Sequence, residues 1–368
     1  MQRSYNLKTK NRGEYMNCKR LFWRICCIAC ILSVLGCSKK ETIIINSGSN
    51  IQQAKQEIVN EPINSPARLY VTAMMDDKVM AIDIDSGEII SEQNVGSKPY
   101  GIAIDYKNRQ LVVVCALANE VWFLDADTLA VLGKTEVGKI PALVTIDDLE
   151  RKAYVSNTVG DAISVIDLDL RTELKQIVTG KSPYNIAVLP NRQLAVLNHE
   201  DGNLVRVDLT DGHIIETYEA VQKASGMAVD LKREVIFSGG HGAEDDGREI
   251  FVHNLREQNL SSKIDTGGMP SAMMIFGDRL YVLLHESEQL VVLDIKEGIH
   301  EINRFSTEKY PFTVESLDNG KKIAVTNMDS DSIQIFDSTD GYAVSRLDVP
   351  GGPVGIAYYQ NERREEQK

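Results

Sequence analysis

Four short apolar runs, separated by turn residues, recur along most of the chain from Ala67 onward. In the first complete unit they cover Pro99–Asp105, Gln110–Val114, Glu120–Leu124 and Ala130–Val137. Val, Ile, Leu and Tyr dominate these runs, which are too short for helices and leave no room for helices between them. Each unit is therefore predicted to be a sheet of four antiparallel strands.

The units repeat at a nearly constant period. Asp83, Asp125 and Asp167 end the third runs of the first three units and lie 42 residues apart, and the later equivalents follow at 41, 45, 41 and 43 residues. These later equivalents are Asp208, His253 (a histidine where aspartate is expected), Asp294 and Asp337. Four-stranded units of 40–45 residues are typical of β-propeller blades. We therefore expect one all-β domain over residues 67–359, a seven-bladed β-propeller of four-stranded antiparallel blades.

The two ends of this domain complement each other. The first unit starts at a second strand, Arg68–Thr72, with no inner strand before it, and the chain supplies such a strand last, at Pro353–Tyr359. Pairing of the C-terminal strand with the N-terminal blade would close the ring and remove its open edges. Residues 360–368 follow as a charged tail.

Several segments resemble the YVTN-repeat β-propeller family. The residues that carry the resemblance are Leu69–Thr72, Ala153–Asn157 and Ala324–Asn327, together with the Pro-x-Gly-Ile-Ala segments Pro99–Ala103 and Pro353–Ala357. The resemblance covers residues 67–359 and implies the propeller fold. It implies little about function, because the family is defined by scaffold repeats.

The N-terminal segment has the pattern of an export signal. Lys19, Arg20 and Arg24 precede an apolar run of 12 residues that ends at Gly36. This run is too short to span a bilayer, which takes about 20 helical residues. A basic segment followed by a short apolar run is typical of a secretory signal. A start at Met16 would give a signal of compact length.

The end of that run resembles the lipobox of bacterial lipoproteins, in the sequence Val34-Leu35-Gly36-Cys37. The resemblance implies cleavage before Cys37 and acylation of this residue. Residues 1–37 are then a lipoprotein signal peptide, and residues 38–66 a polar tether. The folded part would face the periplasm or the cell surface, anchored to the cell membrane or the outer membrane. A plain secretory signal or an uncleaved anchor is the alternative.

Charge and cysteine content indicate which partners and which covalent cross-links the protein lacks. The 368-residue chain has a net charge of −13. Residues 1–37 hold seven basic side chains and one acidic one, so the remainder has 33 basic and 52 acidic residues, a net charge of −19. This balance argues against a nucleic-acid partner, which needs a basic face. Cys115 is the single cysteine after Cys37, so we expect no internal disulfide and a buried spare thiol.

The recurring residues are interpreted as architecture. Aspartates beside tight turns, as in Asp83–Gly87, are expected to accept hydrogen bonds from nearby amides. In the recurring Val-Gly-x-x-Pro segments, glycine is expected to permit an unusual backbone turn, and proline to fix the start of the inner strand. These glycines are not followed by helices, so no phosphate-binding loop is predicted.

Three histidines break the repeat. His199, His241 and His285 follow the second strands of three successive units, with His241 one position later in its loop than the other two. The loop after His241 is also the longest. Acidic side chains accompany the histidines, namely Glu200, Asp201, Glu244, Asp245, Asp246 and Glu286. Loops of this kind emerge on one face of a propeller, so the three imidazoles should lie on adjacent blades.

This set is a candidate transition-metal or ligand site, because imidazole and carboxylate suit Zn, Cu, Ni or Fe(II). Solvated loop residues are the alternative, because ligand atoms on adjacent blades converge only near the ring centre. His213, His253 and His300 are expected to be packing or surface residues. No nucleophile or haem-attachment motif is present, and no cofactor is predicted beyond the candidate metal.

The pattern favours a lipid-anchored binding or assembly scaffold whose loop-rich face recognises an envelope protein or a small ligand. An enzyme is the alternative, either metal-dependent or similar to the quinoprotein, haem-dehydrogenase and lactonase propellers, and the histidines alone favour it. A ligand-sensing lipoprotein that works with a membrane transporter is a third interpretation.

Overall fold

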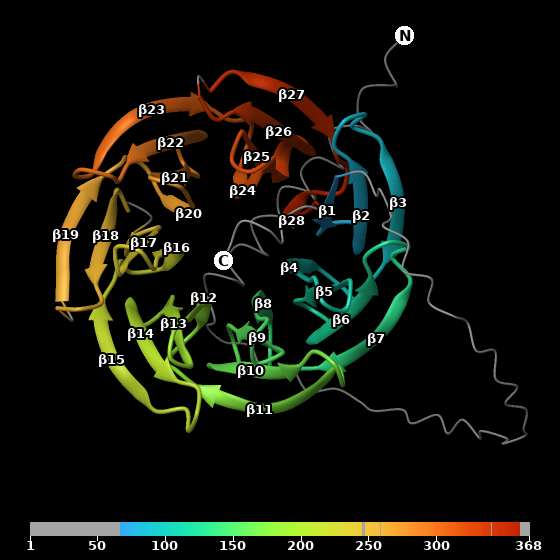
Figure 1. Ribbon diagram of the computed structural model, residues 1–368, viewed down its shortest axis with the longest axis horizontal. Helices are drawn as coiled ribbons and strands as arrows, with labels where there is room; N and C mark the ends of the chain where they lie inside the picture. Colours follow the sequence, from blue (N-terminus) through green and yellow to red (C-terminus); the bar gives the residue numbers. More distant parts are fainter. Residues whose placement is uncertain (1–66, 245–246, 258, 340, 361–368) are drawn as a thin grey trace, which may run out of the picture. The chain divides into compact units, whose positions relative to one another are not determined.

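The computed structural model describes residues 67–360, except 245–246, 258 and 340. These residues form seven four-stranded antiparallel sheets arranged as the blades of a ring. Figure 1 shows one strand of each sheet near the centre and one at the periphery. The predicted seven-bladed β-propeller is confirmed. Among the described residues, no helix is long and apolar enough to cross a membrane.

We number the blades from the one that contains the first strand and list their strands from the centre outward. Blade 1 has β28 (Pro353–Tyr359), β1 (Arg68–Ala73), β2 (Lys78–Asp83) and β3 (Ile89–Asn94), and blade 2 has β4 (Pro99–Asp105), β5 (Gln110–Cys115), β6 (Glu120–Asp125) and β7 (Val131–Glu136). Blade 3 has β8 (Pro141–Asp147), β9 (Lys152–Asn157), β10 (Ala162–Asp167) and β11 (Thr172–Val178). Blade 4 has β12 (Pro183–Leu189), β13 (Gln193–Asn198), β14 (Asn203–Asp208) and β15 (Ile214–Glu219). Blade 5 has β16 (Ala224–Asp230), β17 (Val235–Gly240), β18 (Glu249–Asn254) and β19 (Asn259–Asp265). Blade 6 has β20 (Pro270–Phe276), β21 (Arg279–Leu284), β22 (Gln289–Asp294) and β23 (His300–Ser306). Blade 7 has β24 (Pro311–Leu317), β25 (Lys322–Asn327), β26 (Ser332–Asp337) and β27 (Ala343–Asp348), with a 3-10 turn, η1 (Met328–Ser330), between β25 and β26.

The C-terminal strand closes the ring, as the sequence predicts. Strand β28 pairs antiparallel with β1, with Arg68 opposite Tyr359 and Tyr70 opposite Ala357. All seven residues of β28 are buried. Blade 1 is therefore built from both ends of the folded chain.

Apolar packing lies between the blades. The buried side chains form seven clusters, and each cluster draws its members from two adjacent blades. The cluster between blades 7 and 1, for example, combines Ile333 and Ile335 with Leu69 and Ile82. Each blade thus depends on both neighbours for its core, and the ring is one cooperative unit. This packing accounts for a fold without a disulfide among the described residues, in which Cys115 is a free, buried thiol.

The two faces of the ring differ. We call the face that carries the loops between second and third strands and the connections between blades the loop face, and the opposite one the turn face. On the loop face, the first residue after each second strand donates its backbone N–H to the carbonyl oxygen of the residue that precedes the inner strand of the same blade. Examples are Ala116 to Lys98 (2.9 Å) and Met328 to Tyr310 (3.0 Å). The bond recurs in all seven blades and holds the two loops of each blade together.

In every blade, the residue directly before the inner strand has a left-handed backbone, a feature that was not predicted. The residues at this position have φ between 46° and 67°, as in Lys98, Ile140 and Tyr310. Gly96 and Gly138, in contrast, do not have positive φ. Glycine is required there by close contact, because a Cβ on Gly138 would lie 2.5 Å from Asn157. Gly180 and Gly267 do have positive φ, at 145° and 94°, so the prediction is confirmed before the inner strands of blades 4 and 6 and wrong at Gly96 and Gly138.

The recurring aspartates are architectural, as expected. Asp125 Oδ1 accepts hydrogen bonds from the backbone N–H groups of Asp127 (3.1 Å) and Thr128 (2.9 Å). In blade 5, Asn254 has this role, because its Oδ1 accepts from Arg256 (2.8 Å) and the next residue. The alignment that placed His253 at the aspartate position was therefore wrong by one residue.

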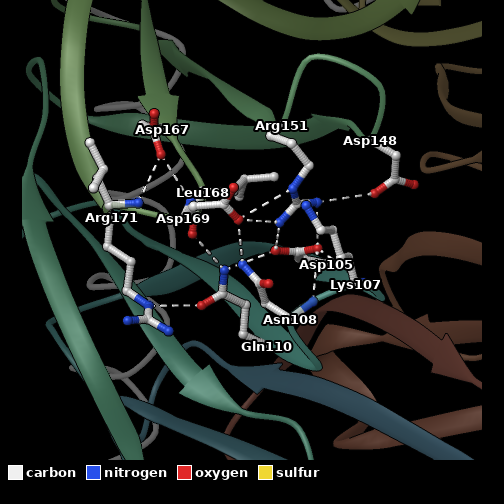
Figure 2. A network of polar contacts seen from close by, with 11 residues as sticks. Asp105, Lys107, Asn108, Gln110, Asp148, Arg151, Asp167, Leu168, Asp169 and Arg171 are labelled. Carbon is white, nitrogen blue, oxygen red and sulfur yellow. Dashed lines mark hydrogen bonds and ion pairs between the residues drawn. The ribbon is translucent and has the colours of Figure 1, made fainter.

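A polar network on the turn face joins blades 2 and 3 (Figure 2). Arg151 lies in the turn between β8 and β9 and donates two hydrogen bonds to Asp105, at 2.8 and 2.6 Å. It also bonds Asp169 Oδ1 at 2.9 Å. Gln110 Nε2 donates to Asp105 Oδ2 at 2.9 Å, and Arg171 Nε donates to Gln110 Oε1 at 2.8 Å. The Asp105 side chain is fully buried, so this network neutralises a carboxylate inside the protein.

Close approach of neighbouring inner strands leads to a stability prediction. A Cβ on Gly355 in β28 would lie 2.2 Å from the carbonyl oxygen of Tyr100 in β4. We expect Gly355→Ala to lower the free energy of unfolding by about 1–3 kcal/mol, because backbone must move to relieve the overlap. Gly133→Ala is the matched control, since its nearest neighbour is the flexible Arg171 side chain at 3.5 Å. Urea unfolding measures both, and equal midpoints for the two variants would contradict the prediction.

Candidate functional site

The three histidines occupy equivalent positions in blades 4, 5 and 6. Each is the first residue after a second strand, and each donates the backbone bond that recurs on the loop face: His199 to Ser182 (2.9 Å), His241 to Lys223 (3.3 Å) and His285 to Met269 (3.1 Å). The offset of one residue expected for His241 is therefore absent. The same position in the remaining blades holds Met74, Ala116, Thr158 and Met328.

The structure brings two of the three imidazoles into contact. The ring centroids of His241 and His285 are 5.5 Å apart, with planes at 61°. The ring of His199 instead lies 6.0 Å from that of Tyr184. Its Nδ1 is 3.1 Å from the carbonyl oxygen of Ala224, which can only accept. Nδ1 of His199 therefore carries a proton.

Aromatic side chains connect these two groups across the ring centre. The hydroxyl oxygens of Tyr100 and Tyr184 are 2.5 Å apart. The ring of Tyr100 packs edge-on against Phe312 at 5.3 Å, and Phe312 lies 5.8 Å from His285. Tyr100, Tyr184 and Phe312 come from the inner strands of blades 2, 4 and 7, which are not adjacent. The contacts therefore bridge the centre of the loop face.

These aromatic residues were not predicted from the sequence. A signal existed, because each follows the proline that starts an inner strand: Pro99-Tyr100, Pro183-Tyr184 and Pro311-Phe312. Other blades have Ala142, Ser271 or Val354 at this position. Large rings at a position that elsewhere holds smaller residues indicate a filled centre.

The local environment keeps His285 uncharged. Burial lowers the pKa of its imidazole well below the usual value, and the neighbouring His241 lowers it further. A backbone hydrogen bond to Pro311 opposes this shift. Both ring nitrogens are buried, and neither makes a hydrogen bond of ordinary geometry with the described residues. Tyr310 at 4.6 Å and Phe312 at 5.8 Å pack against the ring, and their own centroids are 6.2 Å apart, too close to lie on its two opposite faces.

The accompanying carboxylates do not join the imidazoles. Asp201 Oδ2 accepts a hydrogen bond from the backbone N–H of Lys181 at 2.7 Å, which is a structural role. The Glu286 side chain lies over Gly268. Glu200 and Glu244 are exposed, and Asp245 and Asp246 lie outside the described residues. In the described part of the chain, no three His, Cys, Asp or Glu side chains are grouped to hold a metal ion.

A pocket of about 500 Å³ lies between blades 4 and 5, beside the long loop that follows His241. Its walls are Glu219–Gln222 from blade 4 and part of the loop after Gly242 from blade 5. Phe251 also lines it, with Lys263 Nζ 4.0 Å from the centre of this ring. The charged lining residues are Glu219, Arg248, Glu249 and Asp265, so acidic groups outnumber basic ones.

Two other histidines and the free cysteine have structural or surface positions away from this group. His253 is buried, lies 2.7 Å from Ser238 Oγ, and has its pKa lowered to about 4 by burial. His213 is exposed on the turn face and pairs with Asp211 at 2.6 Å. Burial raises the pKa of the Cys115 thiol to about 12, so this residue is not a reactive nucleophile.

Comparison with known proteins supports the fold and goes no further. No protein-family model matches the chain, and no curated protein matches it. Among solved structures, the chain is similar to hydrazine synthase of Kuenenia stuttgartiensis, with a TM-score of 0.67 and 15% identity over 78% of this chain and 99% of that one. A functionally unknown protein from Desulfotomaculum acetoxidans DSM 771 gives a TM-score of 0.70 and 14% identity over 80% and 99%. The dihydro-heme d1 dehydrogenase NirN in complex with DHE gives 0.57 and 14% over 83% and 77%. At such identities the similarity concerns the propeller fold alone.

Proposed function

We propose that this protein is an exported, lipid-anchored propeller of the YVTN-repeat type that binds a partner through blades 4 to 6 of its loop face. The partner is an envelope protein or small ligand with a basic group. This proposal concerns binding, and no chemical step is assigned to the face.

The observation that carries the proposal is where the chain departs from its own repeat. A scaffold needs only its recurring residues, so departures that gather in one place indicate a specific task. The three histidines and the longest loop lie in blades 4 to 6, on the loop face, and the pocket of about 500 Å³ lies beside that loop. Its acidic lining and the net charge of −13 favour a basic group on the partner.

Site-specific photo-crosslinking in intact cells tests this proposal. A photoreactive residue at Ala243, which is exposed and lines the pocket, is expected to give a discrete adduct. The same residue at Val159, in the corresponding loop of blade 3, is the matched control and should give none. Glu219→Lys should weaken the Ala243 adduct several-fold, because it reverses a charge in the pocket wall. Identical adducts from both positions would argue against a binding sector in blades 4 to 6.

The lipid anchor is tested separately. We expect Cys37→Ser to remove acylation, and with it stable membrane attachment, because a lipoprotein's acyl chains are carried by this residue. Labelled fatty acid should be incorporated into the unmodified protein and not into the variant. Cys115→Ser is the control, since the buried thiol has no part in anchoring. Retention of label in the Cys37→Ser variant would contradict the lipoprotein interpretation.

A further inference from the structure

The buried imidazole of His285, at the centre of the loop face, lacks hydrogen-bond partners that a buried polar group needs. A neutral imidazole has one N–H donor and one lone-pair acceptor, and burying either without a partner costs about 1–3 kcal/mol. Both of its nitrogens are buried without a hydrogen bond of ordinary geometry among the described residues. The Pro311 backbone acts on one nitrogen at most, so at least one nitrogen is left without a described partner. A buried group of this kind indicates something else that meets the nitrogens, such as an ion.

The surroundings of the ring limit what that partner can be. Tyr310 and Phe312 pack against His285, and their centroids are 6.2 Å apart, so both restrict access to the ring from neighbouring directions. The nitrogens lie at the edge of the ring. A partner that bonds nitrogen at the edge is a hydrogen-bonding group or a metal ion.

The spacing of the two imidazoles favours a metal ion. Metal–nitrogen bonds to imidazole are about 2.0–2.1 Å long, which places the ring centroid ~3.2 Å from the metal. Two such rings at a tetrahedral angle have centroids ~5.2 Å apart. The centroids of His241 and His285 are 5.5 Å apart, and the ring planes are inclined at 61°, so the two rings are not stacked.

We propose that His241 and His285 together bind one late first-row transition-metal ion, of the class of Zn(II) or Cu(II), through imidazole nitrogens at the centre of the loop face. Imidazole suits these ions better than it suits Mg²⁺ or Ca²⁺. Two protein ligands leave coordination positions open, so the ion is exchangeable and can take an external ligand. His199 is not a ligand, since its ring lies against Tyr184. The site lies in the sector proposed above to bind a partner, and its test requires no partner.

Metal titration of the full chain, purified without a polyhistidine tag, tests the site. Zn(II) and Cu(II) are added separately, and bound metal is measured by mass spectrometry after exhaustive dialysis against weakly chelating buffer. We expect close to one equivalent per chain of at least one of these ions, with Mg²⁺ showing none. His285→Phe and His241→Phe are each expected to weaken binding at least tenfold. His213→Ala, which removes an exposed imidazole from the turn face, should bind as the unmodified chain does.

Two further measurements use the unmodified chain and therefore do not depend on whether a variant folds. Electron paramagnetic resonance of the unmodified chain with one equivalent of Cu(II) should show hyperfine splitting from two equivalent imidazole nitrogens. The added metal should also raise the melting temperature, because it binds the folded state alone. Less than a tenth of an equivalent of either metal, a spectrum without nitrogen coupling, or equal binding by folded His285→Phe protein would each overturn the proposal. Crosslinking at Ala243 reports on the partner independently of all these outcomes.

Discussion

A chain that ends at Gly352 is expected to lose its cooperative unfolding transition and to aggregate. Truncation there removes β28, the inner strand of blade 1, and exposes the edge of β1. Four large buried side chains leave with it: Val354, Ile356, Tyr358 and Tyr359. Burial of each contributes about 1.5–3 kcal/mol, so about 6–12 kcal/mol is lost. This equals the whole stability of an ordinary domain, about 5–15 kcal/mol.

The control is a chain that ends at Gln360, which keeps β28 and removes the charged tail. We expect it to melt within about 1 °C of the full chain, because the strand that closes the ring is intact. Circular dichroism and light scattering during heating measure both variants. A synthetic peptide of residues 350–360 should partly restore the transition of the shorter chain by adding the missing strand. Normal melting of the shorter chain would disprove closure through β28.

Replacement of Arg151 by methionine is expected to cost about 3–5 kcal/mol of stability, because it leaves the buried Asp105 carboxylate without its cation. The Arg151 side chain is 15% exposed and that of Asp105 is fully buried, so water cannot replace the lost cation. Lys78→Ala breaks an exposed pair with Glu92 and should cost much less, because water and salt screen that pair. Urea unfolding midpoints provide the comparison.

The double variant Arg151→Met with Asp105→Asn tells whether the loss arises from the unpaired charge. We expect it to recover part of the stability, because no ionised group is then left buried. If the double variant were as unstable as the sum of the single ones, packing and not charge would explain the loss.

The same pair predicts how stability depends on acid. Burial acts to raise the pKa of Asp105, but the hydrogen bonds from Arg151 and Gln110 and the charge of Arg151 outweigh it, so the pKa is lowered. A lowered carboxylate pKa contributes stability above the unfolded value of about 3.9, and this contribution is lost as the pH falls through the folded value. Unfolding midpoints of Arg151→Met should therefore fall less steeply below about pH 4 than those of the unmodified chain.

Repetition made most of the fold predictable from the sequence. Because four runs recur at 40–45 residues, the strand bounds, the blade number and the closure could be read without knowing any contact. The predicted run Pro99–Asp105 is the observed β4, and the inner strand expected at Pro353–Tyr359 is β28. The errors fall where the repeat is irregular: the long loop of blade 5 shifted the alignment of His253 and of His241 by one residue.

The site was only half visible in the sequence. The histidines stood out because they break the repeat, but periodicity along the chain does not tell which side chains meet across the ring. Tyr100 and Phe312 are 212 residues apart and touch because blades 2 and 7 flank the closing blade. Likewise, the left-handed backbone directly before each inner strand could not be predicted, because lysine, isoleucine and tyrosine all occupy this position.

Closure through β28 makes the connectivity of the ring arbitrary. Arg68 and Tyr359 lie opposite each other in one sheet, so a short linker between them would turn the folded chain into a circle. Such a circle can be reopened at any turn of the turn face, and every reopened chain is a circular permutant with the same blades. New ends in the turn between β12 and β13 would move the ends of the folded chain from blade 1 to blade 4. The position of the chain ends relative to the histidine-bearing blades 4 to 6 can thus be changed without altering those blades.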